Sequence, residues 1–108
     1  MPEQTPTVFR VWPDGEVIAL FPATAAGSQY GDCTCYQHVG QHGSADYHHV
    51  IGKTRRAKPD EYADLLHELK TLGYTPQVYI REQPWMHRER MDEHRRLALA
   101  YAYDQAAV

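Results

Sequence analysis

Two apolar runs near the start of the chain predict a β-hairpin. Residues 8–12 (VFRVW) and 17–21 (VIALF) are separated by Pro13-Asp14-Gly15. Proline presets φ, Asp accepts local backbone hydrogen bonds and Gly adopts a positive φ, as a tight hairpin turn requires. Both runs are apolar on two faces near the turn, so we expect a strand pair covered on one face and partly covered on the other.

Residues 33–39 (CTCYQHV) predict a third strand. A period of two places Cys33 and Cys35 on one face and Tyr36 on the other. The next stretch, residues 40–58 (GQHGSADYHHVIGKTRRAK), contains three glycines and has no sustained period. We therefore expect a long loop, with a short strand or turn near Tyr47–Ile51, and loops of this length in small domains often carry function.

Residues 59–74 (PDEYADLLHELKTLGY) predict a helix. Pro59 suits the first helical position, and Asp60 and Glu61 lie where the helix dipole favours anions. Gly73 is placed to end the helix in the left-handed conformation. One apolar stripe recurs at helical spacing and consists of Tyr62, Leu65, Leu66, Leu69 and Leu72.

The last third of the chain predicts a short strand and a second helix. Residues 75–81 (TPQVYIR) place Val78 and Ile80 on one strand face. From residue 85 to 108 there is no Gly or Pro, so we expect a helix over 84–108. Residues 97–103 (LALAYAY) are apolar nearly all round, so this end is buried against the body or against another subunit, or it frays. A homodimer through 97–103 is therefore one hypothesis.

The order of elements, strand-strand-strand-helix-strand-helix, predicts the α+β class. We expect an antiparallel sheet of about four strands, with one amphipathic helix packed on a face and a C-terminal helix in addition. A chain of 108 residues predicts a single domain. Its expected parts are a flexible lead-in (1–6), an α+β core (7–81) and the C-terminal helix (84–108).

Charge and hydropathy narrow the classes of function. The net charge is −3, with −4 in residues 1–52 and +1 in residues 53–108. Neither half is basic enough to indicate nucleic acid on charge alone. No apolar run has the length of a membrane span, and the first residues lack the pattern of a signal peptide. We expect a cytoplasmic protein with reduced thiols and no cofactor, and no membrane partner.

The two cysteines and the nearby histidines raise the question of a metal site, because zinc prefers thiolate and imidazole ligands. A one-residue gap between thiols in a predicted strand matches no standard spacing, so we expect two reduced core thiols and no metal. If a metal binds, its ligands are Cys33, Cys35, His42 and His48. A metal-dependent or Cys/His enzyme centred on residues 33–49 is a further alternative, although no motif with a known mechanism surrounds either cysteine.

A basic cluster predicts a second alternative, nucleic-acid binding. Four cations lie within six residues, and rings nearby could stack on bases. The competing interpretation is a solvated loop whose charges pair with acids of the following helix. The cluster consists of Lys53, Arg55, Arg56 and Lys58.

Aromatic residues favour a non-catalytic protein-binding module as the first hypothesis. Trp12, Tyr30, Tyr36, Tyr47 and Tyr79 can share one sheet face, with Tyr36 and Tyr79 opposite the leucine-striped helix. The competing interpretation is that the last helix covers this face. The predicted partner-binding residues are Tyr36, His38, Gln41, His42, Tyr47, His48, His49 and Tyr79.

Three stretches, VFRVWPDGEVIALFP, YQHVGQHGSADY and EYADLLHELKTLGY, resemble a family of short bacterial proteins found on plasmids, phages and other mobile elements. The resemblance covers about residues 8–80; the two cysteines and the last helix look like additions to the pattern. It implies no particular activity. It does imply a protein that serves a mobile element by binding a host or partner protein.

Overall fold

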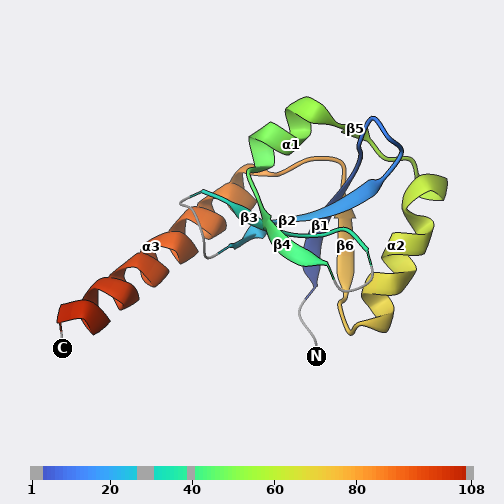
Figure 1. Ribbon diagram of the computed structural model, residues 1–108. Coiled ribbons are helices and arrows are strands. Elements are labelled where there is room, and N and C mark those ends of the chain that lie inside the picture. Colours follow the sequence, from blue (N-terminus) through green and yellow to red (C-terminus); the bar gives the residue numbers. More distant parts are fainter. Residues whose placement is uncertain (1–3, 27–30, 39–40, 107–108) are drawn as a thin grey trace.

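A β-sheet forms the centre of the molecule, and a long helix leaves one end of it (Figure 1). The computed structural model describes residues 4–26, 31–38 and 41–106. This architecture confirms the predicted α+β class. The strands are β1 (Thr5–Val11), β2 (Val17–Ala25), β3 (Cys33–Tyr36), β4 (His42–Ala45), β5 (Arg55–Arg56) and β6 (Pro76–Tyr79), and the helices are α1 (Tyr47–Lys53), α2 (Pro59–Thr71) and α3 (Pro84–Ala106).

The β1–β2 hairpin has the predicted turn. Val8 pairs with Leu20, and Val11 pairs with Val17. Gly15 adopts a φ of 93°, and the Asp14 carboxylate accepts a hydrogen bond from the Glu16 amide at 2.9 Å. The left-handed residue and the side-chain acceptor thus occupy the positions that the tight turn needs.

The sheet is larger than predicted, and one of its pairings is parallel. The strands follow the order β4-β3-β2-β1-β5, and β6 also pairs with β1. β5 lies antiparallel to β1 at residues 10–11, whereas β6 lies parallel to it at residues 5–8. The parallel pairing arises because α2 carries the chain back along the sheet between β5 and β6.

Two apolar clusters occupy opposite faces of the sheet. Phe9 and Phe21 pack under α2 with Leu69, whereas Val8 and Leu20 pack under α1. The alternation predicted for the third strand is confirmed: Cys33 and Cys35 lie with the α1 cluster, and Tyr36 lies with the α2 cluster. Tyr36 therefore packs beneath the leucine-striped helix, and its expected place opposite that helix is wrong. Two other residues with predicted places, Val39 at the end of this strand and Tyr30 before it, lie outside the described residues.

Helix α2 has the predicted ends. Pro59 begins it, and the Glu61 carboxylate accepts a hydrogen bond from the Lys58 amide at 2.9 Å. Gly73 has a φ of 100°, and the Tyr74 amide donates to the Leu69 carbonyl at 3.1 Å. These bonds satisfy backbone groups that a helix end leaves without partners.

The expected long loop over 40–58 is wrong, because it holds β4, α1 and β5. Asp46 caps α1, and its carboxylate accepts a hydrogen bond from the His49 amide at 3.2 Å. Tyr47 and Val50, three residues apart, bury one face of this short helix. The capping residue and the apolar pair are both visible in the sequence, but a helix of seven residues is too short for a periodic pattern.

The molecule is elongated because of α3. Its principal extents are 51 × 33 × 26 Å, and its radius of gyration is 14.7 Å. A compact chain of this size has a radius of about 13 Å. The excess comes from the second half of α3, which extends away from the sheet (Figure 1).

Candidate protein-binding surface

The first half of α3 is fixed to the end of the sheet by a buried arginine. Arg90 is 1% exposed. Its Nε donates to the Gly31 carbonyl at 2.9 Å, and its Nη1 donates to the Pro22 carbonyl and to the Glu82 carboxylate. The guanidinium carbon also lies 5.8 Å from the centre of the Tyr47 ring. A buried cation with a carboxylate partner and two carbonyl acceptors avoids the large cost of an unpaired buried charge.

Two further polar contacts extend this attachment along the helix. The His94 Nε2 lies 2.8 Å from the Asp32 carbonyl oxygen. The Glu93 carboxylate accepts a hydrogen bond from the Ala25 amide at 2.8 Å. The attachment thus reaches residue 94 and joins α3 to the chain on both sides of the β2–β3 connection.

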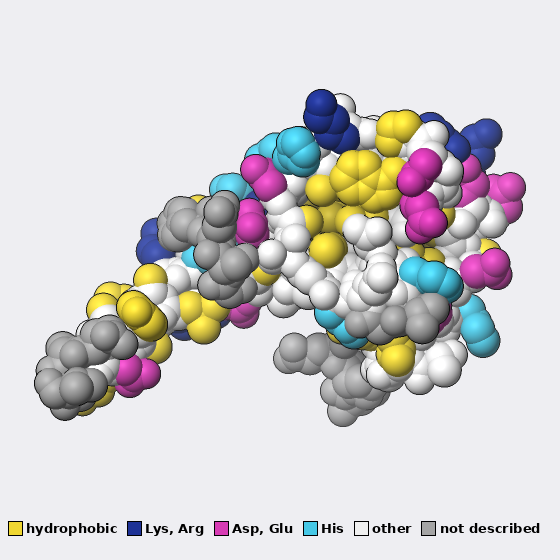
Figure 2. Space-filling model, viewed as in Figure 1, with side chains coloured by type: hydrophobic (Ala, Val, Ile, Leu, Met, Phe, Trp, Pro, Cys, Tyr) yellow, Lys and Arg dark blue, Asp and Glu magenta, His cyan; other side chains and the backbone are white. Residues whose placement is uncertain are grey.

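Beyond this attachment, α3 leaves the body as an exposed apolar segment, residues 97–104, which we call the arm (Figures 1 and 2). Its four large apolar side chains are exposed by about half or more: Leu97 49%, Leu99 70%, Tyr101 68% and Tyr103 76%. Contiguous exposed apolar side chains of this size mark interaction surfaces in soluble proteins.

The arm is apolar on two sides. Leu97 and Tyr101 follow Arg90 by seven and eleven residues, so they continue the helix face that packs on the sheet. Leu99 and Tyr103 lie four residues apart on the other side of the helix. A helix that is apolar around its circumference is normally a buried one.

The eight predicted partner-binding residues do not form one surface. Tyr36 is fully buried, and its hydroxyl donates to the Glu68 carboxylate. Tyr47 is 5% exposed, and its hydroxyl accepts a hydrogen bond from the Glu82 amide at 2.7 Å. Burial raises the pKa of Tyr47. The expectation that these two rings are available to a partner is therefore wrong, because each ring fills the core on its own side of the sheet.

The remaining predicted residues are divided between three places. His38 and Gln41 belong to the β3–β4 connection, and the His42 Nε2 lies 2.8 Å from the Tyr74 hydroxyl. His48 and His49 are exposed on α1. Tyr79 is half-buried, with its ring centre 6.4 Å from that of Trp85. The histidines near residue 40 therefore share no face with those of α1.

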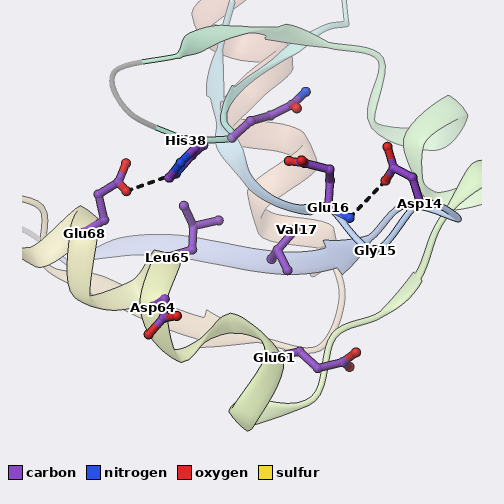
Figure 3. Close-up of a pocket in the computed structure, with 10 residues that line it drawn as sticks. Asp14, Gly15, Glu16, Val17, His38, Glu61, Asp64, Leu65 and Glu68 are labelled. Carbon is purple, nitrogen blue, oxygen red and sulfur yellow. Dashed lines mark hydrogen bonds and ion pairs between the residues drawn. The ribbon is translucent and has the colours of Figure 1, made fainter.

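An acidic groove lies between α2 and the β1–β2 turn (Figure 3). It has a volume of about 420 Å³. The His38 Nδ1 lies 3.4 Å from a Glu68 oxygen at one end, and Val17 and Leu65 form part of its lining. Such a groove attracts cations in general, and by itself it defines no ligand. Its carboxylates, none of which was predicted as part of a site, are Asp14, Glu16, Glu61, Asp64 and Glu68.

The basic cluster is divided between the two faces of the sheet. Arg55 pairs in register with Val11, on the α2 side, and its guanidinium donates to both Glu61 oxygens at 2.9 and 2.6 Å. That arginine holds the pKa of Glu61 down to about 2.

The other three cations of the cluster lie elsewhere. Arg56 pairs in register with Arg10 on the other side of the sheet. Lys53 lines a hollow of about 330 Å³ together with Trp12. Lys58 is exposed at the start of α2.

The cysteines show the character of core residues. Cys33 and Cys35 are buried free thiols, and burial raises the pKa of Cys33 to about 12. A thiol that is so little ionised at neutral pH is a poor nucleophile.

The predicted metal ligands do not lie on one face of the sheet. His42 pairs with Tyr36 in register, so it lies on the face opposite the thiols. Among residues 4–26, 31–38 and 41–106, no three His, Cys, Asp or Glu side chains are grouped to hold a metal ion.

The fold and the arm together define an α+β sheet protein with a projecting helix whose end is apolar and exposed. A scan against protein-family models found no match, and searches of curated proteins and of solved structures found none either. In the described part of the chain, no helix is long and apolar enough to cross a membrane.

Proposed function

We propose that the protein is a non-catalytic binding module that contacts another protein through the arm. The observation that carries this proposal is the exposure of four large apolar side chains, from Leu97 to Tyr103, on a helix that leaves the body. Covering exposed leucine and tyrosine side chains with a partner stabilises the complex by about 25 cal/mol for each Å² of apolar area removed from water. The packed first half of α3 supports the arm by fixing its direction.

The setting that we propose is the cytoplasm, where the two free thiols stay reduced. Service to a plasmid or phage, as the resemblance implies, is part of the same proposal. A small protein of that kind would act on a host or partner protein by occupying one of its surfaces.

The test is capture of a partner by the full chain and by an arm variant. Tagged wild-type protein is expressed in its native host beside the double variant Leu99→Gln, Tyr103→Gln. Leu72→Gln is the matched control, because Leu72 is also 51% exposed but lies at the end of α2. We expect a stoichiometric partner with the wild type and the control and its loss with the arm variant. Equal recovery of the same proteins by all three would contradict the proposal.

A second candidate function, nucleic-acid binding, is favoured by one observation. Trp12 is half-exposed beside Lys53 and Arg55 in the hollow of about 330 Å³. A ring next to cations can stack on a base while the cations contact phosphate. The affinity for a labelled single-stranded oligonucleotide, measured by fluorescence anisotropy, should then fall steeply between low and moderate salt. Lys53→Ala should weaken the binding. Binding that is absent or independent of salt would exclude this function.

A further inference from the structure

The large apolar side chains and the charged side chains in and beside the arm lie at positions that are symmetric about Ala100. Leu97 and Tyr103 lie three residues from it in opposite directions, and Leu99 and Tyr101 lie one residue from it. The charged residues at the two ends, Arg96 and Asp104, are both four residues away, and both are exposed. Alanines fill the positions between the large side chains.

We propose that the occupant of the arm is a second copy of this chain, with the two arms antiparallel about a twofold axis near Ala100. The inference rests on the proposed function and names its partner. In this arrangement the leucines of one arm lie at the same height as the tyrosines of the other. Arg96 lies at the height of Asp104 of the second copy, and the twofold axis repeats this charge pair at the other end.

Charge favours the antiparallel arrangement over a parallel one. The cations Arg95 and Arg96 directly precede the arm, and Asp104 ends it. A parallel pair would place cation beside cation and carboxylate beside carboxylate, whereas an antiparallel pair makes both contacts attractive. It also opposes the two helix dipoles. Since the arm leaves the body at one end, antiparallel arms place the two bodies at opposite ends of the dimer (Figure 1).

The length of the arm limits the affinity of this contact. Eight residues of helix span roughly 12 Å, so the interface falls below the area of a standard protein complex. We therefore expect a reversible dimer with a dissociation constant on the order of 10–100 µM. At such affinity, a change at the two charge pairs is measurable.

The first experiment is sedimentation equilibrium of the full chain over a range of protein concentrations. The wild type is expected to shift from the 12.4 kDa monomer toward twice that mass as concentration rises. Leu99→Gln, Tyr103→Gln should remain monomeric, and the Leu72→Gln control should dimerise like the wild type. Circular dichroism would verify that all three keep the same helix content.

A charge exchange tests the direction of the arms. Arg96→Glu and Asp104→Arg should each weaken dimerisation by about tenfold, because both charge pairs become repulsive. The combination of both changes in one chain should restore the wild-type dissociation constant, since each pair is attractive again with the charges exchanged. In a parallel dimer, neither single change would alter the pairing of like charges and no restoration would occur.

The outcomes separate this inference from the proposed function. A wild type that stays monomeric at the highest concentration overturns self-pairing; if the arm variant still loses a captured partner, the binding function stands with a different protein. Dimerisation that is indifferent to the charge exchange overturns the antiparallel register. Restoration by the double exchange supports both the partner and its orientation.

Discussion

The two halves of α3 reverse the usual relation between polarity and burial. The half that ends at His94 is mostly polar, yet it buries Arg90 and His94 at 1% and 6% exposure. The arm is apolar, yet Tyr101 and Tyr103 are 68% and 76% exposed. Burial of the first half follows from acceptors at the end of the sheet, the carbonyls of residues 22, 31 and 32. The apolar half extends past the end of the sheet.

This comparison shows that a helix can dock through hydrogen bonds where its apolar stripe is weak. The buried donors of the first half, on Arg90 and His94, meet fixed acceptors, so the cost of removing them from water is offset. The arm gains little from its own body, and most of its apolar area is free for another surface. Substitutions that act on one half and spare the other therefore test the contrast.

The largest effect is expected from Arg90→Ala. The substitution leaves the Glu82 carboxylate, which is 11% exposed, without its cation, and it removes the donors to two backbone carbonyls. Losing one partner of a buried pair lowers the free energy of unfolding by about 3–5 kcal/mol. Urea denaturation followed by circular dichroism measures this loss.

Arg88→Ala is the matched control for Arg90→Ala, because Arg88 is exposed two residues earlier on the same helix. Its expected change is within about 0.5 kcal/mol. If Arg90→Ala were as mild as this control, the buried attachment of α3 would not contribute to the stability of the fold.

Leu69→Ala should produce the next largest loss. Leu69, a residue of α2, is fully buried against the face of the sheet that carries Phe9 and Phe21. Truncation leaves a cavity there and should cost about 2–5 kcal/mol in unfolding free energy. Leu72→Ala, three residues later and 51% exposed, should cost far less in the same denaturation assay. Equal losses at the two positions would mean that α2 does not pack as described.

Local chemistry made part of the fold predictable. The Pro13-Asp14-Gly15 turn and α2 were predicted because their determinants lie within a few residues of one another. The parallel pairing of β6 with β1 joins residues about seventy positions apart, and no pattern in either strand specifies it. The β4-α1-β5 stretch was missed because each element is too short to show a period.

The candidate surface likewise has one part that the sequence predicts and another that depends on tertiary packing. The apolar run 97–103 was visible in the sequence, whereas its exposure depends on where the sheet ends. The burial of Tyr36 and Tyr47 depends on which helix covers which face, and the strand pattern alone does not decide this. Arg90 was missed because its carbonyl partners are 59 and 68 residues away in the chain.

Alkaline pH should weaken the packed region of the fold. Burial raises the pKa of Cys33 to about 12 from an ordinary value near 9.0, and the charges of Arg90 and Glu82 act on the same thiol. A raised pKa stabilises the fold fully below pH 9, and this contribution is lost as the pH rises from 9 toward 12. The loss approaches about 1.4 kcal/mol per pH unit.

The measurement for Cys33 is urea unfolding at several pH values under reducing conditions. Cys33→Ala should reduce the slope of stability against pH, and the remainder includes Tyr47, whose pKa burial also raises. Leu99→Ala is the arm control and should leave the slope unchanged. A slope that Cys33→Ala does not alter would mean that the thiol is ionised in the folded protein.

The smallest effect is expected from Leu99→Ala, and its sign is informative. Leu99 is 70% exposed on the arm, so truncation removes little packing. Alanine has a slightly higher helix propensity than leucine, so the unfolding free energy should stay within about 0.5 kcal/mol of the wild type or rise. The measurement belongs at a protein concentration well below the dimer range, because pairing of the arms would add stability that depends on concentration. A loss as large as that of Leu69→Ala under these dilute conditions could come only from packing of the arm on its own body, and the contrast between the halves of α3 would then be false.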